Sequence, residues 1–163
     1  MGAGTGATVP AMSRSHVLLV GSTGGHLAQL VRLEPWWSEL DRTWVTFQMP
    51  DAESLLADEE VVWAHHPTTR NIKNLVRNLF LAVREVRRIR PDIVVSTGAG
   101  VAVPFFVIAR LLRIPTVYIE VFDRIDSPTL TGRLCRPFTT CMCVQWPEQQ
   151  ALYRDAQVIG PLL

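Results

Sequence analysis

Short apolar runs alternate with longer segments of helical periodicity from His16 to the end of the chain. The runs are rich in Val, Ile and Leu, as expected for strands that are buried on both faces of a parallel sheet. They cover residues 16–20, 43–47, 61–65, 92–96, 116–120 and 140–144. Helical patterns begin near Gly25, Ala52, Asn71, Val101 and Thr129. This alternation predicts an α/β fold, a Rossmann-like parallel sheet of about six strands with helices on both faces.

The segment 71–90 has the clearest amphipathic pattern in the chain. Its apolar residues recur at the i, i+3, i+4, i+7 spacing, and we expect this stripe to pack on the sheet: Ile72, Leu75, Val76, Leu79, Val83 and Val86. Another face carries the cations Lys73, Arg77, Arg84, Arg87 and Arg88, flanked by Phe80 and Leu81. Cations beside large apolar groups suit an anionic lipid surface. A basic face that is simply solvated is the alternative interpretation.

The length of 163 residues suits one domain, which we expect to span 16–163 after a disordered leader at 1–15. Apolar residues make up 48% of the chain and charged residues 19%, a balance typical of a folded domain. The formal net charge of +1 predicts no nucleic-acid partner. No apolar run reaches the roughly 18 to 20 residues that cross a bilayer. We therefore expect a cytoplasmic protein.

The three cysteines are Cys135, Cys141 and Cys143. Because they are odd in number and no secretory segment precedes them, we expect reduced thiols. A zinc site would need a fourth ligand and a knuckle spacing that the chain lacks. Cys141 and Cys143 fit better as neighbours on one face of a strand, so we expect no metal.

Two glycine-rich loops follow predicted strands. The first is Gly21-Ser22-Thr23-Gly24-Gly25-His26, and the second is Thr97-Gly98-Ala99-Gly100. Glycines let backbone N–H groups approach an anion closely, and the following helix directs its positive end to the same place. Ligands of open α/β sheets bind at the carboxyl ends of the strands, where the strand order reverses. These loops therefore predict a phosphate-binding crevice.

A third loop runs from Glu120 to Thr129 and leaves the same edge of the sheet. Arg124 can hold a diphosphate, and Asp123 or Asp126 can bind sugar hydroxyls. Ser127 or Thr129 is more simply a cap for the next helix.

His26 is the best candidate for a catalytic base, because an imidazole accepts a proton near neutral pH. The alternative is a purely structural residue at the start of a helix.

Together the strings GSTGGH, STGAGVAVPF, YIEVFDRIDSPTLTGRL and VQWPEQQ resemble the split glycosyltransferases of the GT-B architecture. The chain is similar to their acceptor-binding, recruiting subunit, the Alg-fourteen-like family of oligosaccharide biosynthesis, and to paired chains of bacterial exopolysaccharide systems. It also resembles the N-terminal domain of the enzyme that adds N-acetylglucosamine to the peptidoglycan lipid precursor. The resemblance covers nearly all of 16–163 and implies the N-terminal half of a GT-B fold.

The resemblance implies an inverting hexosyltransferase subunit that is inactive without its partner. The chain would bind a lipid-diphosphate-linked acceptor, while the partner chain binds most of the nucleotide-sugar donor; no cofactor is implied. Gly21, Gly24, Gly25 and His26 would line the acceptor diphosphate site, and Gly98 and Gly100 the second loop. Glu120 would lie at the acceptor or catalytic cleft, where it is the second catalytic candidate beside His26. The family's eukaryotic subunit has an N-terminal membrane helix that this sequence lacks, so we expect peripheral contact with an anionic membrane at its cytoplasmic face.

Two other functions are compatible with the pattern. One is a recruiting scaffold that holds substrate and supplies no chemical group. The other is a nicotinamide-binding Rossmann domain, against which the spacing of Gly21, Gly24 and Gly25 argues.

Overall fold

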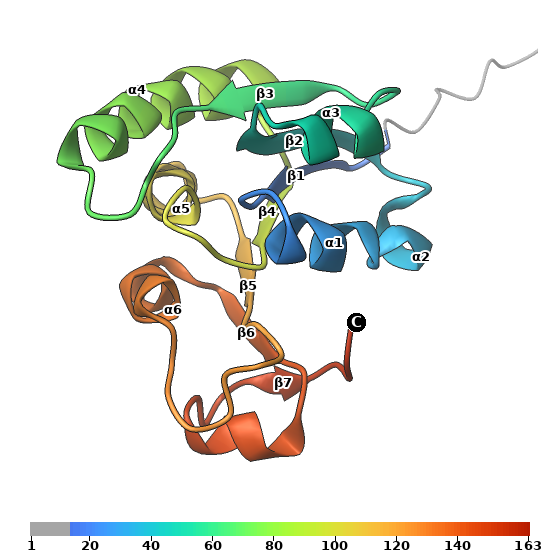
Figure 1. Ribbon diagram of the computed structural model, residues 1–163, viewed down its shortest axis with the longest axis vertical. Helices are drawn as coiled ribbons and strands as arrows, with labels where there is room; N and C mark the ends of the chain where they lie inside the picture. Colours follow the sequence, from blue (N-terminus) through green and yellow to red (C-terminus); the bar gives the residue numbers. More distant parts are fainter. Residues whose placement is uncertain (1–13) are drawn as a thin grey trace, which may run out of the picture.

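The computed structural model describes residues 14–163, so most of the predicted leader lies outside the described residues. The strands are β1 (His16–Val20), β2 (Asp41–Phe47), β3 (Val61–Ala64), β4 (Ile93–Ser96), β5 (Thr116–Ile119), β6 (Cys141–Val144) and β7 (Gln157–Val158). They form one parallel sheet in the order β3-β2-β1-β4-β5-β6-β7 (Figure 1). The predicted α/β class and the six predicted strands are confirmed. The two-residue β7 is too short to produce a hydrophobic pattern.

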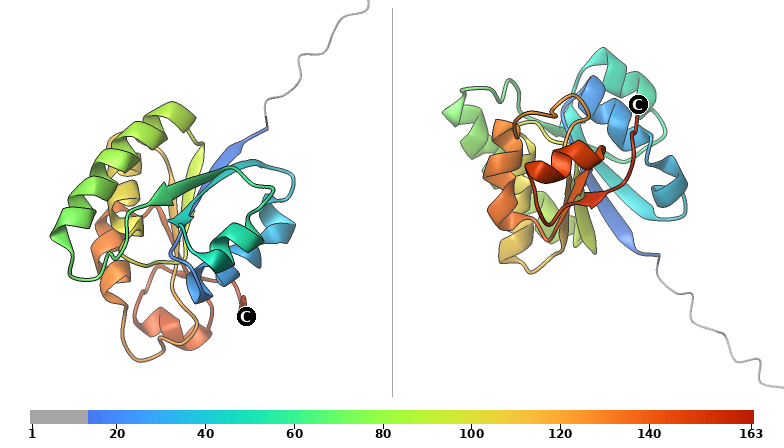
Figure 2. Two further views of the ribbon diagram at one scale, coloured as in Figure 1. Left: turned by 45° about the horizontal axis from the view of Figure 1, so that its top comes forward. Right: turned by 90° about the horizontal axis from the view of Figure 1, so that it is seen from below.

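Helices cover both faces of the sheet, as predicted. They are α1 (Gly25–Val31), α2 (Glu34–Trp37), α3 (Pro50–Leu55), α4 (Ile72–Ile89), α5 (Ala102–Leu111) and α6 (Leu130–Cys135), with the 3-10 turns η1 (Arg136–Phe138) and η2 (Pro147–Ala151). The helices α4, α5 and α6 lie on one side of the sheet and α1, α2 and α3 on the other (Figures 1 and 2). The N-cap of α4 is Asn71 and that of α6 is Thr129, each through a side chain that accepts a backbone N–H bond.

The central strands are buried on both faces, which explains their continuous apolar sequences. Alternate residues of β1 face different cores: Leu18 and Val20 pack with α4 and α5, while Val17 and Leu19 pack with α1. All four are fully buried. The sheet therefore separates two hydrophobic cores.

The predicted orientation of α4 is confirmed at Val83 and Val86, which pack against the core, and is wrong for the first two turns of the helix. Its first two turns expose the apolar stripe, with Ile72 78% and Val76 46% accessible, whereas the buried face carries Asn74 and Asn78. Asn78 bonds both backbone groups of His65, at 2.8 and 2.9 Å, which satisfies its amide inside the protein. Hydrogen bonds to the chain after β3 therefore decide which side of α4 faces inward, against the hydrophobic periodicity.

The strand order reverses between β1 and β4. The chain builds outward from β1 through β2 to β3, and then crosses to β4 on the other side of β1. Val20 lies opposite Ser96, so the first loop residues after these strands, Gly21 and Thr97, emerge side by side. This is the position at which open α/β sheets form a binding crevice.

Candidate functional site

The two glycine loops meet through His26 and Thr97. His26 Nδ1 lies 2.8 Å from the carbonyl oxygen of Thr97, and Thr97 Oγ1 donates to the carbonyl oxygen of His26 at 2.8 Å. Because a carbonyl oxygen only accepts, Nδ1 carries the proton and Nε2 retains its lone pair in the neutral ring. The structure thus brings both loops to one edge of the sheet and fixes the imidazole tautomer.

Gly98 is required by the close approach of the imidazole. Its φ of 116° is rarely adopted by residues with a side chain. A Cβ atom there would lie 2.9 Å from the hydroxyl of Tyr118 and 3.1 Å from Cε1 of His26. Gly100 is also crowded, since a Cβ would lie 3.0 Å from the side chain of Thr68. Both glycines support the loop that orients His26.

The first loop has two of its amides already bonded. The N–H of Gly21 donates to the carbonyl of Val45 at 3.0 Å, and that of Gly24 donates to Asp51 Oδ2 at 2.9 Å. Asp51 lies in the first turn of α3 and was not singled out by the sequence, because an acidic residue there is common at any helix start. An anion that approached Gly24 would meet this carboxylate.

A pocket of about 340 Å³ lies beside His26. Its walls come from α1 and from the loop between β5 and α6: Gly25, His26, Gln29, Val121, Phe122, Asp123, Arg124 and Thr129. Three predicted site residues, Gly25, His26 and Arg124, therefore share one pocket. The other predicted residues of the glycine loops, Gly21, Ser22, Thr23, Gly24, Thr97, Gly98 and Gly100, lie outside its lining.

Glu120 lies beneath this pocket and is fully buried. Its carboxylate accepts hydrogen bonds from Tyr153 Oη at 2.5 Å, from the N–H of Val121 at 3.1 Å and from Thr129 Oγ1 at 3.0 Å. Burial, followed by the nearby charge of Glu120, raises the pKa of Tyr118. Burial and the hydrogen bond to Glu120 likewise raise the pKa of Tyr153, so both phenols stay protonated. These contacts connect the predicted cleft residue to the loop itself.

Three buried glutamines in this region were not predicted as site residues. Gln145 Nε2 donates to Gln29 Oε1 at 2.5 Å and to the carbonyl of Glu120 at 3.0 Å. Gln149 Nε2 donates to the carbonyls of Val121 at 2.8 Å and Arg124 at 3.0 Å. The available signal was the polar pair Gln145 and Gln149 on either side of Trp146-Pro147. Their distant partners cannot be read from that spacing.

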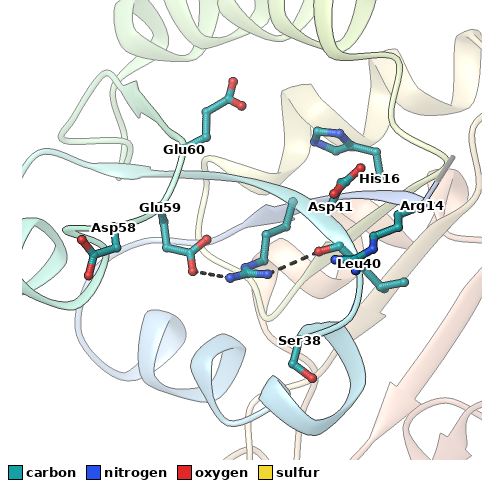
Figure 3. A pocket seen from close by; sticks show the side chains of 9 residues that line it. Arg14, His16, Ser38, Leu40, Asp41, Asp58, Glu59 and Glu60 are labelled. Carbon is teal, nitrogen blue, oxygen red and sulfur yellow. Dashed lines mark hydrogen bonds and ion pairs between the residues drawn. The ribbon is translucent and has the colours of Figure 1, made fainter. Parts of the chain in front are cut away.

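Another cavity lies at the opposite edge of the sheet. It has a volume of about 430 Å³ and lies at the amino ends of β1 and β2 (Figure 3). Its acidic side chains include Glu59, which pairs with Arg42 at 2.6 Å. Ligands of parallel sheets bind at the carboxyl ends of the strands, so the smaller His26 pocket is the better candidate.

None of the three cysteines is paired in a disulfide. Burial raises the pKa of Cys135 to about 12, and burial together with Cys141 raises that of Cys143 to about 12. Within residues 14–163, no group of three or more His, Cys, Asp or Glu side chains is arranged to hold a metal ion. In the same range, no helix combines the length and the apolar content needed to cross a bilayer.

Comparison with known proteins identifies relatives for most of the described chain. Residues 63–162 match the family model described as "Oligosaccharide biosynthesis protein Alg14 like". The chain is 34% identical over 118 residues to the UDP-N-acetylglucosamine transferase subunit ALG14 of Eremothecium gossypii, covering 67% of this chain and 53% of that protein. It is also 34% identical over 91 residues to the UDP-N-acetylglucosamine--N-acetylmuramyl-(pentapeptide) pyrophosphoryl-undecaprenol N-acetylglucosamine transferase of Syntrophotalea carbinolica, covering 55% of this chain and 25% of that enzyme.

The fold is similar to one half of a solved glycosyltransferase. MurG of Acinetobacter baumannii superposes with a TM-score of 0.70 at 20% identity, over 82% of this chain and 42% of MurG. This likeness confirms the predicted GT-B half-fold. The chain thus spans about half of the length of the ALG14 subunit and less than half of MurG.

Proposed function

The chain belongs to the Alg14-like family of oligosaccharide biosynthesis proteins, and on that premise we propose that it is the acceptor-binding subunit of a two-chain glycosyltransferase. The reaction transfers N-acetylglucosamine or a similar sugar from a nucleotide-diphosphate sugar to a lipid-diphosphate-linked acceptor. The ALG14 relative, named as a transferase subunit, supports the proposal. The observation that carries it is the His26–Thr97 bond at the point where the strand order reverses.

His26 is the general base of this mechanism. With Nδ1 donating to Thr97, the Nε2 lone pair can accept the proton of the acceptor hydroxyl. The hydroxyl oxygen then forms a bond to the anomeric carbon while the bond to the nucleotide diphosphate breaks, with inversion. The leaving diphosphate carries away the bonding electrons, and its charge is met by the partner chain, which binds the donor.

The acceptor diphosphate binds beside His26, with Arg124 supplying charge-assisted hydrogen bonds. Arg124 lines the pocket and its side chain is exposed, so it is accessible to a ligand. Ser22 and Thr23 add hydroxyls at the first loop. The carboxylate of Asp51 must leave the N–H of Gly24 if the diphosphate binds there, because two anions would repel at that position.

The exposed apolar side chains of α4 support peripheral membrane contact at the cytoplasmic face. Ile72 and Phe80 are 78% and 71% exposed, and α4 lies at one end of the layer that it forms with α5 and α6 (Figure 1). Lys73 and Arg77 lie on the same helix and are exposed. Apolar side chains that enter the interface beside cations bind anionic lipid, which would bring a lipid-linked acceptor to the chain.

The enzymatic proposal is tested in the complex reconstituted with a donor-binding partner subunit. His26→Ala should lower turnover about 10²- to 10⁴-fold, the usual contribution of a general base, without loss of complex formation. The matched control is His65→Ala, which removes an exposed imidazole outside the pocket. Unchanged turnover in His26→Ala would show that the chain is a recruiting scaffold without a chemical role. Tight binding of a nicotinamide dinucleotide by the isolated chain would contradict the whole assignment.

The membrane proposal is tested by sedimentation with vesicles containing anionic phospholipid at low salt. The double variant Ile72→Ser, Phe80→Ser should bind at least about tenfold more weakly, because it removes the apolar groups that enter the interface. Leu55→Ser is the control, since Leu55 is 56% exposed on α3, which lies on the other side of the sheet. Equal binding of both variants and wild type would rule out this surface.

A further inference from the structure

The loop between β5 and α6 forms one wall of the His26 pocket although it has almost no regular structure of its own. Between Val121 and Thr129 it contains only turns and bends, and the residues from Phe122 to Ser127 are exposed. The pocket residues Asp123 and Arg124 lie in this segment. A segment with few internal bonds needs external partners to keep one conformation.

Gln149 of η2 holds the first half of this loop. Its side-chain amide is fully buried and uses all of its hydrogen-bonding capacity. The NH₂ group donates to the carbonyls of Val121 and Arg124, and Oε1 accepts from the N–H groups of Gln145 at 2.8 Å and Trp146 at 3.2 Å. Only a primary amide of this length can donate twice and accept twice here.

Trp146 adds a third bond to the same segment. Its indole N–H donates to the carbonyl of Phe122 at 2.9 Å. Three loop carbonyls, those of Val121, Phe122 and Arg124, therefore accept hydrogen bonds from the single stretch Trp146–Gln149. The loop and this stretch are more than twenty residues apart in sequence, as the separation of 28 between Gln149 and Val121 shows.

Glu120 holds the loop from the other side. Its two carboxylate oxygens accept from the N–H of Val121 at 3.1 Å, where the loop begins, and from the N–H of Thr129 at 3.2 Å, where it ends. Tyr153 donates to the same carboxylate. Gly132 permits the close approach of α6, because a Cβ atom there would collide with Tyr153 and Glu120.

We propose that Gln149 and Glu120 are positioning residues that together fix the 121–129 loop in the conformation that binds the acceptor diphosphate. The inference rests on the proposed function, since that function makes Arg124 an acceptor ligand. Glu120 then acts through the loop and transfers no proton, which differs from its predicted place among the catalytic groups. Its complete burial and its set of donors support this role.

The first experiment measures how often the loop opens, from the hydrogen-exchange rates of its backbone amides, by NMR in the isolated full chain. Gln149→Glu keeps the size of the side chain but removes both donors to the loop, and exchange at Val121 and Thr129 should rise about tenfold. Gln150→Glu is the matched control: the same change at the next residue, which is exposed and contacts Ala156 rather than the loop. If Gln149→Glu does not fold, Trp146→Phe removes a single donor and should raise exchange at the same amides.

The second experiment measures kinetics of the reconstituted complex. Gln149→Glu and Trp146→Phe should raise the KM for the lipid-linked acceptor about tenfold and about threefold, with the KM for the donor unchanged. Glu120→Gln should also raise the acceptor KM and keep both limbs of the pH–rate profile. Loss of a limb would make Glu120 a proton-transfer group and overturn its positioning role.

The two proposals fail in different ways. If the wild-type complex transfers no sugar, the proposed function is wrong, while hydrogen exchange still decides whether these side chains hold the loop. If wild type is active but exchange and acceptor KM are unchanged in the Gln149 and Trp146 variants, the positioning role is wrong and the function stands.

Discussion

His26 shows how a single residue acquires a defined chemical state from its surroundings. The sequence places it after a strand and three glycines, but its tautomer depends on the carbonyl of Thr97, which is 71 residues away. Gly98 then allows the ring to lie close to the second loop. His26 is a candidate base by residue type alone, but its imidazole is oriented to accept a proton only because the two loops meet.

Gly98→Ala should destabilise the protein by about 1 to 3 kcal/mol, because the new methyl group combines a left-handed backbone with contacts to Tyr118 and His26. Chemical denaturation measures this change. Gly25→Ala is the control, since its backbone is helical and a Cβ there meets nothing within 4 Å. Equal stability of both variants would show that the loop relaxes freely around residue 98.

At the scale of one element, α4 shows that hydrophobic periodicity predicts where a helix forms, whereas tertiary contacts decide which of its faces is buried. The helix forms where its pattern predicts, yet its inner face contains Asn74, Asn78 and Glu85. The asparagines bond the backbone after β3, and Glu85 accepts from Arg84 and Arg88 at 2.7 Å each. Partners make buried polar groups tolerable, so the apolar side chains in the first two turns of α4 stay exposed.

Glu85 should make stability depend on pH in the acid range. Burial alone would raise its pKa, but hydrogen bonds from Arg88 and Arg84 lower it below the ordinary value of 4.5. A carboxyl group whose folded pKa is lowered stabilises the protein fully above its unfolded pKa, and this stabilisation is lost as the pH falls through the folded pKa. Glu85→Gln should therefore lower the free energy of unfolding at pH 7. The difference in stability between the variant and wild type should become smaller below pH 4.5.

Thermal unfolding of Glu85→Gln and wild type between neutral and acid pH measures this difference in stability. Glu148→Gln, at an exposed position of η2, is the control and should follow wild type. A difference between Glu85→Gln and wild type that is the same at every pH would show that the ion pairs of Glu85 add no pH-dependent stability.

At the scale of the whole molecule, one sheet with a core on each face positions the site. The core on the α1 side includes the edge-to-face pair Trp37 and Trp44, whose ring centroids lie 5.5 Å apart. The other side packs α4, α5 and α6 against the same strands. Because β1 and β4 contribute side chains to both cores, packing on both faces of the sheet fixes the positions of the strand ends that border the crevice.

Trp44→Ala should cost about 3 to 5 kcal/mol, the usual loss when a buried aromatic side chain leaves a cavity. Trp44 is 1% exposed, whereas Trp36, in α2, is 45% exposed. Trp36→Ala should therefore change stability by less than about 1 kcal/mol. Denaturant unfolding monitored by circular dichroism compares the two, and similar losses would contradict the assigned core.

By itself, the sequence determined the α/β class, six of the strands, the starts of most helices and the two loops that meet at His26, because local patterns record which residues avoid water and where glycine is needed. Tertiary structure decided which face of α4 is buried, that Asp51 contacts Gly24, and that Gln149 and Glu120 hold the 121–129 loop. Each of these depends on a hydrogen bond between different segments of the chain, with separations that range from 9 residues for Glu120 and Thr129 to 28 residues for Gln149 and Val121. Such a bond depends on where two backbones approach in space, and no local period of hydrophobic and polar residues carries that information.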